Sequence, residues 1–113
     1  MTRVERPPAQ ALVGLLAGPR LAQAISVAAK LGLADLVDAG SRTPVELAAS
    51  TGANADALHR MLRTLASAGI FEEEETSGRF RLTPLAGPLR STAPDSIRAY
   101  AVMAGERWIW QAL

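Results

Sequence analysis

The sequence predicts a mainly α-helical fold: a winged helix-turn-helix with a small β-hairpin and additional N- and C-terminal helices suited to dimerisation. A helix-start motif, Thr43-Pro-Val-Glu46, is followed by a second helical stretch that ends at Gly69. Two short β-type runs come next, separated by the turn sequence Thr76-Ser-Gly. Hydrophobic residues make up 49% of the chain and aromatic residues only 4%, which favours closely packed helices around a small core. At 113 residues, the chain is long enough for one domain.

Two apolar helices are expected before the helix-turn-helix. Alanine and leucine recur at helical spacing from Ala9 to Ala17, and we expect this first helix to end at Gly18-Pro19. Pro19 then suits the first turn of a second helix. Gly32 is expected to end that helix in the left-handed conformation, before one more apolar turn through Val37. The apolar positions of the second helix are Leu21, Ala24, Ile25, Ala28 and Leu31.

The helix-turn-helix is predicted from its capping residues. In a capping box, the Thr43 hydroxyl accepts a hydrogen bond from the backbone of Glu46, whose carboxylate accepts one from the backbone of Thr43. Pro44 fits the first helical position. Gly52 ends this helix, and Asn54 caps the next one. That next helix has an apolar face (Leu58, Met61, Leu62 and Leu65) and a polar face (Asp56, His59, Arg60, Arg63 and Ser67).

The hairpin and the C-terminal part complete the prediction. Residues 70–71 begin the first strand, and residues 80–82 alternate as the return strand. Thr83-Pro84 signals another helix start. A last helix is expected from about Asp95, with a bend at Gly105.

Both DNA-binding regulators and enzymes that dimerise through this domain use a winged helix. His59, Arg60 and Arg63 have the chemistry to reach base edges and phosphates. Against this, residues 72–75 place four glutamates on the wing, where they would repel phosphates. The formal net charge of +1 also lacks the basic surface of a nucleic-acid binder. We favour a solvated face that pairs with these glutamates, and a DNA-binding transcription regulator is the alternative function.

Candidate catalytic and metal sites are scarce in the sequence. His59 is the only histidine and cysteine is absent, so neither a metal site nor a base held by a second group is indicated. The sequence has no Gly-x-Gly, which excludes a dinucleotide fingerprint or a P-loop in these residues. We therefore predict no catalytic, cofactor-binding or metal-binding residue. The lack of cysteine fits a cytoplasmic location, and no apolar run reaches membrane-spanning length.

Aromatic and polarisable side chains gather near the C-terminus, at Tyr100, Met103, Trp108 and Trp110. A monomer rarely exposes such a surface. These side chains can pack on the domain's own helices, or they can line a pocket or a subunit interface. They can also lead into a further part of a longer natural protein. We favour this last interpretation together with a pocket or an interface.

Five stretches together resemble the N-terminal domain of the S-adenosylmethionine-dependent small-molecule O-methyltransferases, which act on plant phenolics and on bacterial polyketide and antibiotic precursors. The resemblance covers about Ala9 to Leu113, and the combination with the aromatic ending is what makes it specific. The stretches are Ala24-Ile-Ser-Val-Ala-Ala-Lys-Leu-Gly-Leu-Ala-Asp-Leu, Arg42-Thr-Pro-Val-Glu-Leu-Ala, Leu58-His-Arg-Met-Leu-Arg-Thr-Leu-Ala-Ser-Ala-Gly-Ile-Phe, Phe80-Arg-Leu-Thr-Pro-Leu-Ala and Trp108-Ile-Trp-Gln-Ala-Leu.

The resemblance implies a homodimer formed through the first helices and the helix after the wing. It implies that S-adenosylmethionine and the catalytic base belong to a Rossmann-like domain downstream of these residues, so that the chain alone is not catalytic. Met103, Trp108 and Trp110 would be substrate-proximal, in the wall of the acceptor site. The reaction would be methyl transfer to a phenolic or enolic hydroxyl of an aromatic small molecule. A free-standing small-molecule binding or interaction module is a third hypothesis.

The chain is expected to divide into three parts, of which the first is polar and carries two prolines. We expect a disordered tail at residues 1–8 and a winged-helix dimerisation domain at residues 9–94. Residues 95–113 are expected to form a C-terminal helix that leads toward the absent catalytic domain. Neither a nucleic acid nor a membrane is an expected partner.

Overall fold

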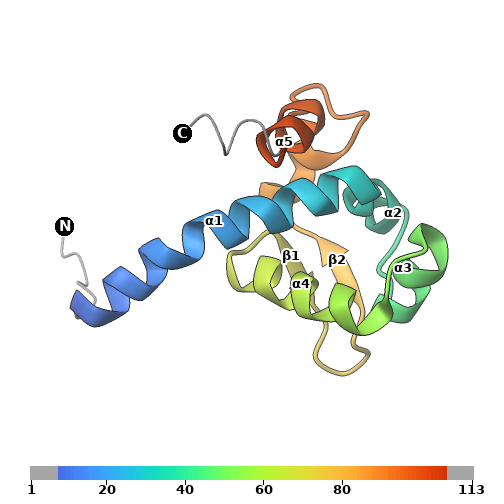
Figure 1. Ribbon diagram of the computed structural model, residues 1–113. Coiled ribbons are helices and arrows are strands. Elements are labelled where there is room, and N and C mark those ends of the chain that lie inside the picture. Colours follow the sequence, from blue (N-terminus) through green and yellow to red (C-terminus); the bar gives the residue numbers. More distant parts are fainter. Residues whose placement is uncertain (1–7, 107–113) are drawn as a thin grey trace.

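A computed structural model describes residues 8–106 of the chain. In chain order, the elements are α1 (Pro8–Leu31), α2 (Leu33–Asp38), α3 (Pro44–Thr51), α4 (Ala55–Ser67), β1 (Phe71–Glu73), β2 (Phe80–Leu82), the 3-10 helix η1 (Pro84–Leu89) and α5 (Arg98–Ala104). This order confirms the predicted mainly α-helical winged helix-turn-helix with a hairpin. Figure 1 shows α2, α3, α4 and the hairpin as a body crossed by α1, with α5 on the other side of α1 from α4.

Helix α1 corrects the prediction that Gly18-Pro19 separates two helices. The helix runs without interruption from Pro8 to Leu31 and carries Pro19 inside it. A stop would require Gly18 in the left-handed conformation, and Gly18 is not among the glycines with positive φ. The proline therefore removes one backbone donor without ending the helix. As a result, the N-terminal half of α1 projects away from the body (Figure 1).

The predicted capping residues of the helix-turn-helix are confirmed. The backbone N–H of Glu46 donates to the Thr43 hydroxyl over 3.2 Å, and the backbone N–H of Thr43 donates to the Glu46 carboxylate over 2.9 Å. Gly52 ends α3 with φ 77°, in the left-handed conformation expected of a helix stop. The Asn54 side chain accepts from the backbone N–H of Ala57 at the start of α4. Thr43 and Glu46 thus define the start of α3, and Gly52 and Asn54 define the turn between α3 and α4.

The wing is an antiparallel hairpin whose return strand also pairs with the segment before α3. Phe71 pairs with Leu82, and Glu73 pairs with Phe80. Phe80 also exchanges two backbone hydrogen bonds with Arg42, at 2.7 and 3.0 Å, just before α3. The segment that leads into the helix-turn-helix is thus tied to the return strand.

The hydrophobic core lies between the hairpin and helices α1 to α4, and η1 and α5 add buried residues to it. Its largest fully buried side chains come from both strands and from α2, α3 and α4. They are Phe71, Phe80, Leu33, Leu47, Leu62 and Leu65. Alanines of α1, among them Ala28 and Ala29, are buried against this core. The C-terminal half of α1 is therefore part of the body.

The segment after the wing differs from the prediction in two respects. Thr83 caps a 3-10 helix, η1, at the predicted start. The last helix begins at Arg98, three residues after the expected Asp95, because the backbone N–H of Ile97 bonds back to the Pro88 carbonyl over 2.8 Å. Helix α5 ends at Gly105 in a turn. Among the helices of residues 8–106, none is both long and apolar enough to cross a lipid bilayer.

Candidate functional site

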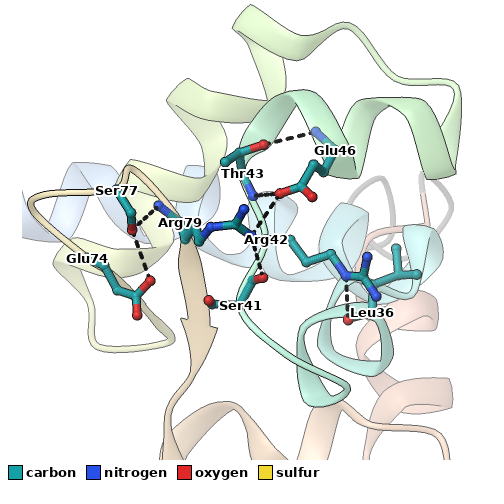
Figure 2. A network of polar contacts seen from close by, with 8 residues as sticks. All are labelled: Leu36, Ser41, Arg42, Thr43, Glu46, Glu74, Ser77 and Arg79. Carbon is teal, nitrogen blue, oxygen red and sulfur yellow. Dashed lines mark hydrogen bonds and ion pairs between the residues drawn. The ribbon is translucent and has the colours of Figure 1, made fainter.

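A polar network joins the wing to the start of α3 (Figure 2). One guanidinium nitrogen of Arg79 donates to the Glu46 carboxylate and to the Ser41 carbonyl, each over 3.0 Å. The backbone N–H of Thr43 lowers the pKa of Glu46 most, and the Thr43 hydroxyl and the charges of Arg79 and Arg42 lower it further, against an opposing effect of burial. The side chain of Arg42 donates to the Leu36 carbonyl over 3.2 Å. This network attaches the wing to the start of α3, and Arg79 and Glu46 within it pair with each other.

The outer face of α4, which the DNA-binding alternative would use, contacts the wing. His59 lies 3.4 Å from the Glu73 carboxylate, and Arg63 lies 3.9 Å from its other oxygen. Arg81 pairs with Glu72 on the neighbouring strand. Two residues of the expected recognition face thus contact the acidic wing, as the sequence predicted, and the carboxylates of the wing repel phosphates.

The imidazole of His59 contacts an aromatic side chain of the wing. Its ring packs edge-to-face on Phe80, with centroids 6.0 Å apart. In residues 8–106, no group of three histidine, cysteine or acidic side chains has a geometry that could hold a metal ion.

An apolar surface lies where α1, η1 and α5 meet. A groove of about 300 Å³ is lined by Leu21, Ile25, Ile70, Leu85, Leu89 and Ile97, together with Ala68. A second hollow of about 210 Å³ shares Ile25 and Ile97 with it and continues along α5 to Tyr100. Leu85 and Tyr100 are each 64% exposed, and Ile97 is 48% exposed. Large exposed side chains thus form one continuous apolar face, which we call the α1–α5 face.

Met103, one of the predicted substrate-proximal residues, lies on α5 one turn after Tyr100 and is 42% exposed. Trp108 and Trp110 lie outside the described residues. Met103 is near the α1–α5 face but does not line its hollows.

Sequence reasoning missed two residues of this region, Leu85 and Ser26. Leu85 follows Pro84 in a helix-start signal, and nothing in that local pattern distinguishes its exposed position. Ser26 is not among the apolar positions expected for its helix, yet it is the buried polar residue of the described core. Its hydroxyl contacts α5, 76 residues further along the chain, and such a contact has no local sequence signal.

Comparison with known proteins agrees with this architecture. Residues 13–90 match the family model of the O-methyltransferase dimerisation domain. The phenazine O-methyltransferase PhzM of Lysobacter antibioticus is 50% identical over 100 residues, which cover 88% of this chain and 29% of that protein. A 3-amino-4-hydroxybenzoate 4-O-methyltransferase of Streptomyces cremeus is 40% identical over 105 residues, covering 90% of this chain and 28% of the relative.

Solved structures give the same result. The crystal structure of LaPhzM superposes with a TM-score of 0.85 at 46% identity, covering 95% of this chain and 32% of that one. The SAH-bound form of CalO1, a methyltransferase in calicheamicin biosynthesis, gives 0.79 at 39% identity, covering 94% and 32%. The chain thus spans less than a third of the length of each of these proteins. The match covers most of the chain, and we conclude that it belongs to the O-methyltransferase dimerisation domain family.

Proposed function

We propose that this chain is the dimerisation and substrate-wall domain of an S-adenosylmethionine-dependent O-methyltransferase. The acceptor would be a hydroxylated aromatic or polyketide-type small molecule. The observation that carries the proposal is the family match over residues 13–90, on a fold that superposes on the N-terminal third of solved methyltransferases. The names of the two curated relatives add that both methylate an oxygen of an aromatic ring system.

The partner in this proposal is a second copy of the chain, seated on the α1–α5 face. Leu85, Ile97 and Tyr100 place large apolar side chains in water there, and burying such surface is the main driving force for association. A domain of this size gains by sharing a core with a partner. A twofold dimer would bury the same face of both copies.

The substrate wall is assigned to α5 and the residues after it. Met103 is exposed near the α1–α5 face, and a thioether contacts the edge of an aromatic ring favourably. Trp108 and Trp110 would add flat surfaces suited to an aromatic acceptor. The three residues are proposed to bind and orient the acceptor while excluding water from it.

Cofactor binding is proposed to occur in a downstream domain, outside these 113 residues. S-adenosylmethionine supplies the methyl group in this chemistry. Glycine loops of the type that hold such a cofactor are missing from the sequence. The chain alone is therefore expected neither to bind S-adenosylmethionine nor to transfer a methyl group.

The direct test is a methyl-transfer assay on the complete product of the gene that encodes this chain. With S-adenosylmethionine and either a hydroxylated phenazine or 3-amino-4-hydroxybenzoate, we expect a methylated product by mass spectrometry. Met103→Ala should raise the KM for the acceptor more than that for S-adenosylmethionine. Val45→Ala, which alters another exposed apolar residue on α3, is the matched control and should change neither. Failure to methylate either probe would contradict the proposal.

A gel-shift experiment tests the alternative of a DNA-binding regulator. Duplex binding at low salt that weakens in Arg60→Ala and Arg63→Ala variants would support a regulator. We expect no shift, because the carboxylates of the wing meet the phosphates first.

A further inference from the structure

Helix α5 lies against α1 through a seam of small residues and side-chain-to-backbone hydrogen bonds. Ser26 of α1 is 1% exposed, and its hydroxyl donates to the Val102 carbonyl over 3.2 Å. The Gln23 side chain donates to the Gly105 carbonyl over 3.5 Å. The last carbonyls of a helix have no partners within the helix itself. In α5, side chains of α1 thus donate to two carbonyls at its C-terminal end, and that of Val102 also accepts from the Gly105 N–H over 3.3 Å.

Two further contacts hold the same helix. The guanidinium of Arg98, at the start of α5, donates to the Ala29 carbonyl over 2.9 Å. Lys30 lies 3.5 Å from the carboxylate of Glu106, just after the helix. Both ends of α5 are thus attached to a short stretch of α1, and the buried Ser26 contact lies between them.

Gly105 provides the space for this close approach. A Cβ atom added there would lie 2.0 Å from the Ser26 hydroxyl oxygen and 2.4 Å from the Ser26 Cβ. The φ angle of Gly105 is −90°, which any residue adopts. Glycine is therefore required by the neighbouring Ser26 and not by the backbone. The next atom that the added Cβ would meet is the Gln23 side-chain oxygen, at 3.5 Å, an ordinary contact.

We propose that Ser26 and Gly105 form an interhelical lock that positions α5, and with it Met103, relative to the body of the domain. Both are positioning residues, since neither would touch the acceptor. The role of Met103 in a substrate wall rests on the proposed function, whereas the contact between Ser26 and Gly105 does not. A ligand wall displaced by about 1 Å can cost a large factor in activity, so the lock would set how well the acceptor is held.

Residue-resolved hydrogen exchange on the chain tests the lock. Gly105→Ala should lower the protection of α5 amides, such as that of Ala101, by about tenfold or more relative to α4 amides. Gly18→Ala is the matched control, because that glycine lies in α1 with open space around it and should leave the ratio unchanged. Ser26→Ala removes the hydroxyl without adding bulk and is a milder variant, expected to lower the ratio several-fold.

A second substitution that restores the protection of α5 amides distinguishes a lock from general destabilisation. In Ser26→Gly/Gly105→Ala both clashing atoms are gone, so α5 protection should return to that of Ser26→Gly alone. Equal loss of protection in α4 and α5, or absence of rescue, would overturn the lock.

Kinetics of the complete gene product then test its consequence. With the hydroxylated phenazine or 3-amino-4-hydroxybenzoate, Gly105→Ala should raise the acceptor KM about tenfold and leave that for S-adenosylmethionine unchanged, with recovery in the double variant. An unchanged acceptor KM, together with loosened α5 amides, would overturn the positioning role. A wild-type protein that methylates neither probe would overturn the proposed function and the acceptor role, while the exchange result would still decide the lock.

Discussion

The helix-turn-helix with its wing differs from the α1–α5 face in how far its side chains find partners within the domain. In the wing region, polar and charged side chains find partners within the domain: Arg79 with Glu46, Arg81 with Glu72, and His59 with Glu73. The helix ends there are capped by their own side chains. On the α1–α5 face, by contrast, large apolar side chains such as Leu85 and Tyr100 remain exposed.

This difference explains how a DNA-reading architecture can serve another purpose. The part that resembles a DNA reader, which we call the support, pairs several of its charged side chains within the domain. The part with unsatisfied surface is apolar, and apolar surface is buried by protein or by a flat organic ligand and not by a phosphate backbone. The contrast makes predictions for both regions.

The largest effect is expected in the support. Phe80 is fully buried, pairs with both Glu73 and Arg42 through its backbone, and packs against His59. Phe80→Ala should lower the free energy of unfolding by about 3–5 kcal/mol, through lost burial and a cavity. Urea denaturation measures this. Val45→Ala on the surface of α3 should stay within about 0.5 kcal/mol, and a similarly small loss for Phe80→Ala would mean that the wing is not part of the core.

An intermediate effect is expected at the cap of α3. Thr43→Ala removes the acceptor for the Glu46 backbone N–H and should lower the free energy of unfolding by about 1 kcal/mol. Thr64→Ala is a suitable control, because the hydroxyl of Thr64 only bonds back to the Arg60 carbonyl within α4. If both variants lose equal stability in urea, the capping box does not stabilise the support.

The smallest effect is expected from acid. The pKa of Glu46 is lowered in the folded chain, so its stabilising contribution is present above the unfolded pKa, near pH 4.5, and is lost as the pH falls through the lowered folded value. Glu46→Gln keeps a hydrogen-bond acceptor but cannot titrate. The stability difference between wild type and this variant, followed by urea denaturation from neutral to acid pH, should shrink on acidification. A pH-independent difference would contradict the charge network of Figure 2.

Local chemistry made the support predictable from sequence. The capping box of Thr43 and Glu46, the cap at Asn54 and the stop at Gly52 all act within a few residues, and each was confirmed. The wing's pairing with α4 was also anticipated, because only one acidic run lies close in sequence to His59 and Arg63.

The α1–α5 region was predictable only in outline. Pro19 carries a strong local signal for a break, and the continuous helix overrides it. Ser26 is not among the apolar positions expected for the helix, and its partner Val102 lies 76 residues away. Met103 was located on α5 as expected, but its part in a substrate wall remains a proposal.

The central claim is that the α1–α5 face is covered by a second copy of the chain. Sedimentation equilibrium at micromolar concentration tests it most directly, with Leu85→Glu and Val45→Glu as a matched pair, since these residues are 64% and 68% exposed. We predict twice the mass of the chain for the wild type and for Val45→Glu, and the mass of a single chain for Leu85→Glu. A wild-type monomer, or a Leu85→Glu dimer as stable as the wild type, would contradict the account.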